Sequence, residues 1–160
     1  MPIQALVLDT NIALDLLVFD DPACAPLREA LADGELCWIA TEPMRTELAR
    51  VLGYPLIAAR LARLARTPAQ VLTGFDAQSR QVEAPGAAPC RCEDPDDQVF
   101  IDLAVAHRAR LLSKDRAVLV MRRPLEALGV QVAPLFASVS SAGESLSLSS
   151  AAVRSVRPAG

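Results

Sequence analysis

The stretch Ile3-Gln-Ala-Leu-Val-Leu-Asp-Thr-Asn11 decides the fold prediction for this chain. Residues 3–8 form a short apolar run, which is typical of a strand buried on both faces of a parallel sheet. The run ends at Asp9, and apolar residues at helical spacing follow over residues 12–17. A polar turn between a buried strand and a helix begins a β-α unit and places Asp9 at the carboxyl end of the strand.

The rest of the chain continues this alternation. Further strands are predicted at 36–40, 110–113 and 130–133. Helices are predicted, from capping residues and apolar periodicity, at 22–34, 42–52, 55–66, 68–80, 97–109, 115–121 and 124–128. Residues 82–95 contain three prolines and a glycine, so we expect an irregular connection there, with a short strand before it left open. The predicted class is α/β, with a central parallel sheet flanked by helices.

Length and composition favour one folded domain. The chain has 160 residues, of which 52% are hydrophobic and 22% charged, enough apolar surface for one core. We expect this domain to cover residues 1–136. Residues 137–160 are rich in Ser and Ala, and we expect a C-terminal tail that is either mobile or docks on a partner or a second copy of the chain.

Charge and targeting signals restrict the class of protein further. The formal net charge is -3, which by itself disfavours a protein that binds phosphate groups. The sequence contains neither a membrane-spanning apolar run nor a basic signal-peptide start, so we expect a cytoplasmic protein with no membrane partner. The cysteines are then expected to be free thiols, with a structural zinc at Cys90 and Cys92 as the weaker alternative.

Carboxylates are the candidates for chemistry, because the chain has one histidine and no Gly-rich phosphate loop. Asp9 and Asp115 each follow a predicted strand, at the edge where open α/β sheets place their binding crevice. Glu47 and Asp97 lie on predicted helices next to apolar residues at helical spacing, and Glu47 is expected to face inward and to need a partner charge or a metal.

Structural roles remain open for the aspartates taken singly. Each fits a turn or a helix cap, and Asp94 and Asp96 compete with Asp97 for the cap of its helix. Asp102 lies elsewhere on that helix and either supports the site or is a surface residue. Four carboxylates facing one crevice would repel one another, so together they predict a bound cation. Ligands that are all oxygen favour Mg²⁺ or Mn²⁺ over Zn²⁺.

Four segments resemble the motifs of the PIN domain in their order and spacing. They are Leu6-Val-Leu-Asp-Thr-Asn11, Thr46-Glu-Leu48, Asp94-Pro-Asp-Asp-Gln-Val-Phe100 and Ser113-Lys-Asp115. The resemblance covers about residues 3–136 and implies a metal-dependent ribonuclease with a PIN-like α/β/α sandwich built on about five parallel strands. The Asp-Pro-Asp-Asp segment is similar to that of a toxin-antitoxin branch related to VapC-type toxins.

The resemblance also implies roles for single residues. Asp9, Glu47, Asp97 and Asp115 correspond to the family's catalytic, metal-binding acids. Asn11 and Ser113 match polar positions that line the site, and Thr10 and Asp102 are added as supporting candidates. This sequence has Ala117 where that branch often has a further acid, which leaves one or two metal ions open.

Substrate contacts are predicted from the basic side chains near these motifs. Arg45, Arg50 and Lys114 are the candidates for binding the RNA backbone, with an ordinary solvated face as the alternative. Because aromatic residues make up only 4% of the chain, the sequence predicts no stacking platform for bases.

Two functions follow from these patterns. The first is an endoribonuclease that leaves 5′-phosphate and 3′-hydroxyl ends and acts as the toxin of a toxin-antitoxin pair, with an antitoxin protein as partner and a homodimer as its assembly. The second is a PIN-fold module that binds RNA or protein with weak or no catalysis.

Overall fold

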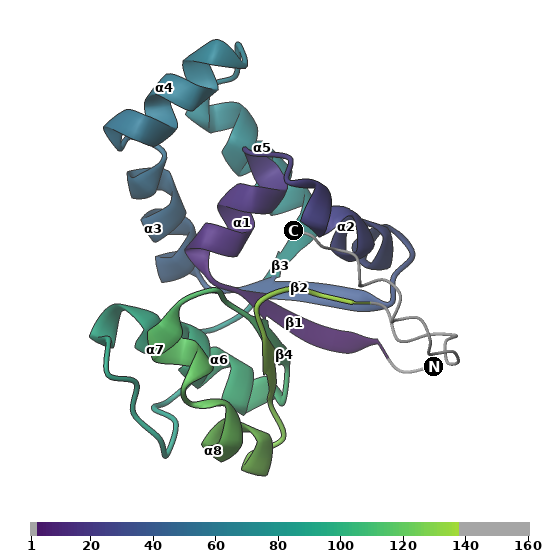
Figure 1. Ribbon diagram of the computed structural model, residues 1–160, viewed down its shortest axis with the longest axis vertical. Helices are drawn as coiled ribbons and strands as arrows, with labels where there is room; N and C mark the ends of the chain where they lie inside the picture. The colour runs from purple at the N-terminus through teal and green to yellow at the C-terminus, as the bar shows by residue number, and fades with distance from the viewer. Residues whose placement is uncertain (1–2, 138–160) are drawn as a thin grey trace, which may run out of the picture.

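Residues 3–137 are described by the computed structural model, and they form a five-stranded, all-parallel sheet with helices on both faces (Figure 1). The strands are β1 (Gln4–Leu8), β2 (Leu36–Ala40), β3 (Ser79–Gln81), β4 (Arg110–Leu112) and β5 (Gln131–Ala133). Their order across the sheet is β3-β2-β1-β4-β5. The predicted α/β class and the parallel sheet of about five strands are therefore confirmed.

The helices divide between the two faces of the sheet. They are α1 (Thr10–Leu17), α2 (Ala25–Ala32), α3 (Glu42–Val51), α4 (Pro55–Arg63), α5 (Pro68–Gln78), α6 (Gln98–His107), α7 (Arg116–Leu119) and α8 (Arg122–Ala127), with 3₁₀ turns η1 (Pro22–Cys24) and η2 (Pro95–Asp97). In Figure 1, α1, α2 and α5 lie on one face, α6, α7 and α8 lie on the other, and α3 and α4 extend beyond the sheet. The fold is thus a PIN-like α/β/α sandwich.

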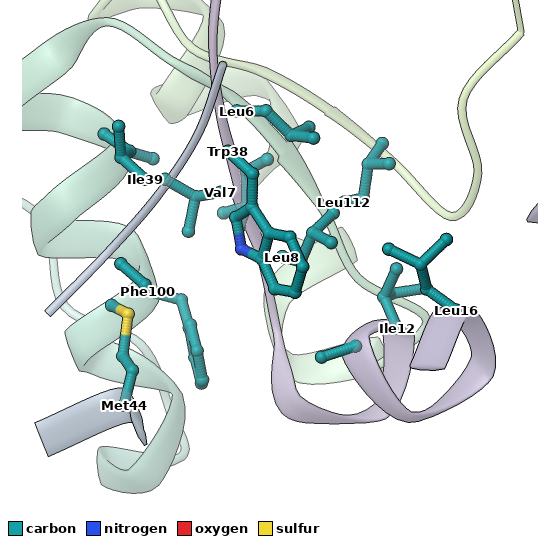
Figure 2. Close-up of a cluster of buried hydrophobic side chains, with 14 of the residues drawn as sticks. Leu6, Val7, Leu8, Ile12, Leu16, Trp38, Ile39, Met44, Phe100 and Leu112 are labelled. Carbon is teal, nitrogen blue, oxygen red and sulfur yellow. The ribbon is translucent and has the colours of Figure 1, made fainter. Parts of the chain in front are cut away.

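The core lies on both faces of the central strand. Leu6, Val7 and Leu8 of β1 are all buried, as expected for a strand covered on both sides. Figure 2 shows Trp38 of β2 within this cluster, and its ring meets Phe75 of α5 edge-on at a centroid distance of 5.0 Å. This packing fixes β1, whose carboxyl end carries Asp9.

Several helix boundaries differ from the predictions, and two of the differences have a clear local cause. The predicted helix at 22–34 is split into η1 and α2, because Pro26 has no N–H to donate and its ring disfavours a continuous α-helix through the preceding turn. The helix predicted at 97–109 ends at His107, since Arg108 adopts a left-handed conformation with φ 49°.

The short strand that was left open before residue 82 exists as β3, but it begins within the segment predicted to be helical. Residues 68–80 were expected to be helical, but α5 ends at Gln78 and Ser79–Gln81 pairs in parallel with Trp38–Ala40. Ser79 is already extended, with φ -118° and ψ 163°. The three residues are polar and lie at an edge of the sheet, so they lack the apolar pattern by which strands are predicted.

Three further predictions concern the tail, membrane-spanning segments and the cysteines. The predicted tail lies outside the described residues, apart from Ala137. None of the helices in the described part of the chain is both long and apolar enough to span a membrane. All four cysteines are free thiols.

Candidate metal centre

Asp9 is fixed at the carboxyl end of β1 by two donors. Its Oδ1 accepts the backbone N–H of Ile12 at 2.9 Å, which caps α1, and its Oδ2 accepts the hydroxyl of Ser113. The side chain is only 3% exposed. Burial raises the pKa of Asp9, although the bonds from Ser113 and Ile12 oppose this shift. Asp9 is therefore oriented before any ligand arrives.

Ser113 connects the ends of two neighbouring strands. It follows β4, whose Leu112 lies beside Leu8 of β1. Its hydroxyl donates to Asp9 and accepts the backbone N–H of Asp115 at 3.0 Å. Because β1 and β4 are neighbours, Asp9 and Asp115 lie at the same edge of the sheet, as expected.

Asp94, Asp97 and Asp115 form a cluster of acids. Each places one carboxylate oxygen within 4.8 Å of the others. Asp94 and Asp115 each use one oxygen as a local cap, accepting the N–H of Asp96 and Ala117, both at 2.9 Å. Three carboxylates with oxygens this close repel one another unless a proton or a cation lies among them.

Asp97 has the carboxylate oxygen of this cluster that lacks a hydrogen-bond partner among the described residues. It is buried, and within the described residues its Oδ2 has no hydrogen-bond partner. Burial, followed by the neighbouring Asp115, raises the pKa of Asp97 to about 7. An unpartnered buried carboxylate oxygen is costly, so this atom is oriented for a ligand that the protein itself does not supply.

The predicted acids open into one cleft of about 770 Å³. Asp9, Glu47, Asp97 and Asp115 all line it, as do Thr10 and Asn11. The cleft lies between α3 and α4 on one side and η2 and α6 on the other. The buried side chains of Met44 on α3 and Phe100 on α6, both labelled in Figure 2, line it too.

A family comparison agrees with this arrangement. The family model of the PIN domain matches residues 5–117. The chain belongs to the PIN domain family. All four predicted acids fall inside the matched segment. No curated protein matches the chain. PIN domains are generally metal-dependent nucleases.

The acids of this PIN domain fit a divalent cation. The cluster offers oxygen ligands alone, it holds more carboxylates than it can keep ionised by itself, and Asp97 Oδ2 is left for an external partner. Mg²⁺ and Mn²⁺ prefer this donor set, whereas Zn²⁺ favours nitrogen and sulfur ligands. Asp94, Asp97 and Asp115 would hold the ion.

Glu47 differs from its predicted environment. Met44, Leu48 and Val51 form the buried stripe of α3, and Glu47 lies at its edge, half-buried at the rim of the cleft. Its partner charge is Arg50, one turn later on the same helix. Glu47 faces the cleft, but it is not one of the three acids in the close cluster.

Two of the predicted RNA contacts form ion pairs with acids on neighbouring helices, and their role in RNA binding stays a prediction. Arg45 donates from both Nε and Nη2 to the carboxylate of Asp76 on α5, each at 2.8 Å. Lys114 pairs with Asp15 of α1. Neither side chain lines the cleft, because each is attracted to an acid on a neighbouring helix. Arg50 does not line the cleft itself but forms an ion pair with Glu47, which does.

Asp102 does not reach the cleft either. Its Oδ1 accepts the backbone N–H of Ala88 at 2.9 Å and the side-chain amide of Gln98 at 2.8 Å. It therefore holds the connection between β3 and η2 against α6, and its supporting role at the metal site stays a prediction.

Gln98 was missed by the sequence analysis. This buried amide accepts from Cys92 N–H at 2.6 Å and donates to the carbonyl of Cys90 at 3.0 Å. The Cys92 thiol in turn donates to the carbonyl of Ala117 at 3.5 Å. These bonds fix the segment that leads into Asp94. The role of Gln98 depends on how the segment around Cys90 and Cys92 folds back onto α6, and the sequence gives no signal for that.

The sequence predicts Asp94 only as a helix cap. It does cap η2, and it also belongs to the acidic cluster. The spacing of Asp94 and Asp97, three residues apart, was the available signal, because one tight turn brings such a pair to the same side.

Proposed function

We propose that this PIN domain is an endoribonuclease that hydrolyses RNA phosphodiester bonds with Mg²⁺ or Mn²⁺. The observation that carries the proposal is the buried, unpartnered Oδ2 of Asp97 beside Asp94 and Asp115 in an open cleft. When bound there, a divalent cation supplies positive charge next to the scissile phosphate and lowers the pKa of a bound water.

The side chains of the cleft have distinct roles in this proposal. Asp97, Asp115 and Asp94 hold the ion, and Asp9 completes the negative site while Ser113 keeps its carboxylate oriented. Thr10 and Asn11 contact the substrate or its water from the wall of the cleft. Glu47 lies at the rim, where it is positioned to accept a proton from the attacking water. The products carry 5′-phosphate and 3′-hydroxyl ends.

A nuclease assay with metal control tests the proposal. Purified wild type and Asp9→Asn are incubated with several structured and unstructured RNAs in Mg²⁺ or Mn²⁺, and in EDTA. We expect cleavage by the wild type that disappears in EDTA and in Asp9→Asn. Cleavage that survives the substitution would exclude the proposed site.

The Asp94-Pro-Asp-Asp97 segment supports a more specific role as the toxin of a toxin-antitoxin pair. In this role the protein acts in the cytoplasm as a homodimer, and an antitoxin protein restrains it. Expression of the wild type is then expected to arrest growth, and expression of Asp9→Asn is not.

The alternative, a PIN module that binds without cleaving, is favoured by one observation. Ala117 stands where a further acid would be needed for a second ion, and its N–H is already used to cap Asp115. Metal-independent RNA binding without cleavage in the same assay would favour this alternative.

A further inference from the structure

Exposed apolar side chains gather at the mouth of the acidic cleft. In the part of the chain that the structure describes, seven large apolar side chains are exposed, and three of them, Tyr54, Leu56 and Val99, line this cleft. Tyr54 and Leu56 lie at the start of α4, and Val99 lies on the first turn of α6. They therefore border the acids from both sides of the cleft. Exposed apolar groups gathered at one concave site indicate a ligand surface.

The cleft is otherwise poor in groups that could hold a phosphate chain. None of its lining residues is a Lys, Arg or His. Arg50, on α3, forms an ion pair with Glu47, which lines the cleft. A polyanion therefore gains little from side-chain charge inside this cleft, and the surface beyond the acids suits an uncharged, flat group.

We propose that Tyr54, together with Leu56 and Val99, forms a subsite for a nucleobase next to the phosphate that the acids attack. This inference rests on the proposed function: a base of the bound RNA strand would pack against these three apolar side chains. Tyr54 is 47% exposed and lines the cleft, so part of its side chain is accessible to a ligand there. Leu56 and Val99 supply apolar surface for the edge of a base.

The size of the cleft agrees with this assignment. A volume of about 770 Å³ exceeds the needs of a hydrated ion and lies in the range of small-ligand pockets, roughly 300–1,000 Å³. The low aromatic content had predicted no stacking platform, but one ring placed at the cleft is sufficient for one base.

The single tyrosine of the chain allows a direct test. The full chain labelled with 3-fluorotyrosine gives one ¹⁹F resonance, from Tyr54, which is followed in Mg²⁺ during titration with 5′-AMP or with ribose 5-phosphate. The two probes share the phosphate and the ribose and differ in the base. We expect a saturable shift with 5′-AMP and little shift with ribose 5-phosphate. Equal responses to both probes would overturn the proposal.

Variants separate stacking from a structural role. Tyr54→Ala is expected to weaken 5′-AMP binding by roughly 5- to 150-fold, whereas Tyr54→Phe keeps affinity within about twofold. Leu64→Ala is the matched control. Leu64 lies at the end of α4, is 42% exposed and does not line the cleft, so this variant is expected to bind 5′-AMP normally. Tyr54→Ala with unchanged affinity, or with a changed oligomeric state as the only effect, would overturn the subsite in favour of a protein interface.

These measurements are independent of cleavage, because 5′-AMP contains no internucleotide bond. Failure of RNA hydrolysis would therefore count against the proposed function, and failure of the ¹⁹F response would count against the base subsite alone.

Discussion

Asp97 and Asp115 lie at the starts of different helices, and a carboxylate oxygen of one lies within 4.8 Å of a carboxylate oxygen of the other. Asp97 is the more buried of the two, and its Oδ2 is unpartnered among the described residues. The fold therefore brings two carboxyl groups together, and no Lys or Arg among residues 3–137 forms an ion pair with either of them. A divalent ion relieves the repulsion between these groups, and the following predictions test its consequences.

Metal binding is expected to stabilise the protein. At a Mn²⁺ concentration about 100-fold above Kd, the wild type should gain about 2.7 kcal/mol and its Tm should rise by about 5–10 °C. Asp97→Asn and Asp115→Asn should lose most of this rise, whereas the exposed Asp33→Asn should keep it. Differential scanning calorimetry measures the effect. An equal Mn²⁺ shift in Asp97→Asn and wild type would contradict the assignment of the ligands.

Stability without metal is expected to fall as pH rises. The pKa of Asp97 is about 7 in the folded chain against 3.8 in the unfolded chain, so the native state binds more protons between these values. The stabilisation is fully present below about pH 4 and is lost as pH passes through about 7. From pH 5 to pH 8 in EDTA, urea unfolding should show a loss of about 1–2 kcal/mol, which is less than the full pKa shift implies because solvent in the open cleft screens the charges.

Asp97→Asn should remove most of this pH dependence and be more stable than the wild type at pH 8. Asp33→Asn should follow the wild type. If Asp97→Asn keeps the full slope, another group is responsible for it.

Ser113 is expected to orient Asp9. In Ser113→Ala, Asp9 loses the hydroxyl that donates to it, and the N–H of Asp115 loses its acceptor. The unfolding free energy should fall by about 1–3 kcal/mol, and Mn²⁺ affinity by about tenfold. Ser79→Ala removes a comparable serine bond, to the carbonyl of Phe75, outside the cleft and is the matched control. Equal Mn²⁺ affinity in both variants would refute the orienting role.

Gln98 is expected to hold the segment that carries Asp94. Gln98→Leu keeps the approximate size of the side chain but removes its bonds to Cys90, Cys92 and Asp102. The Cys92 amide should lose protection in hydrogen exchange, and Mn²⁺ affinity should fall about 10–100-fold. The exposed Gln78→Leu serves as control. Unchanged protection at Cys92 would show that the connection is held by other contacts.

The sequence predicted the parts of this molecule that follow local patterns. β1 is apolar throughout its buried end, and an acid directly after a strand lies at the sheet edge whatever the neighbouring strands are. Asp9 and Asp115 could be placed together for this reason. Tertiary pairing determines β3, whose polar residues Ser79–Gln81 form a strand only because β2 offers its edge.

Side-chain orientation was less accessible than backbone position. Arg45 and Lys114 were placed near the right motifs, but Asp76 and Asp15 lie on other helices and attract them away from the cleft. Asp102 and Gln98 bind a connection that has no periodic pattern, so no sequence signal distinguished them from surface residues. Such pairings depend on contacts between distant segments.

The most direct test of the central claim is the rate of RNA cleavage as a function of Mn²⁺ concentration for three proteins. The wild type and Asp33→Asn should cleave an end-labelled RNA at a rate that rises with Mn²⁺ and saturates. Asp97→Asn should be slower by at least about 100-fold at every concentration. Cleavage by Asp97→Asn at the wild-type rate, or a wild-type rate that EDTA leaves unchanged, would contradict the claim that these acids form a catalytic metal centre.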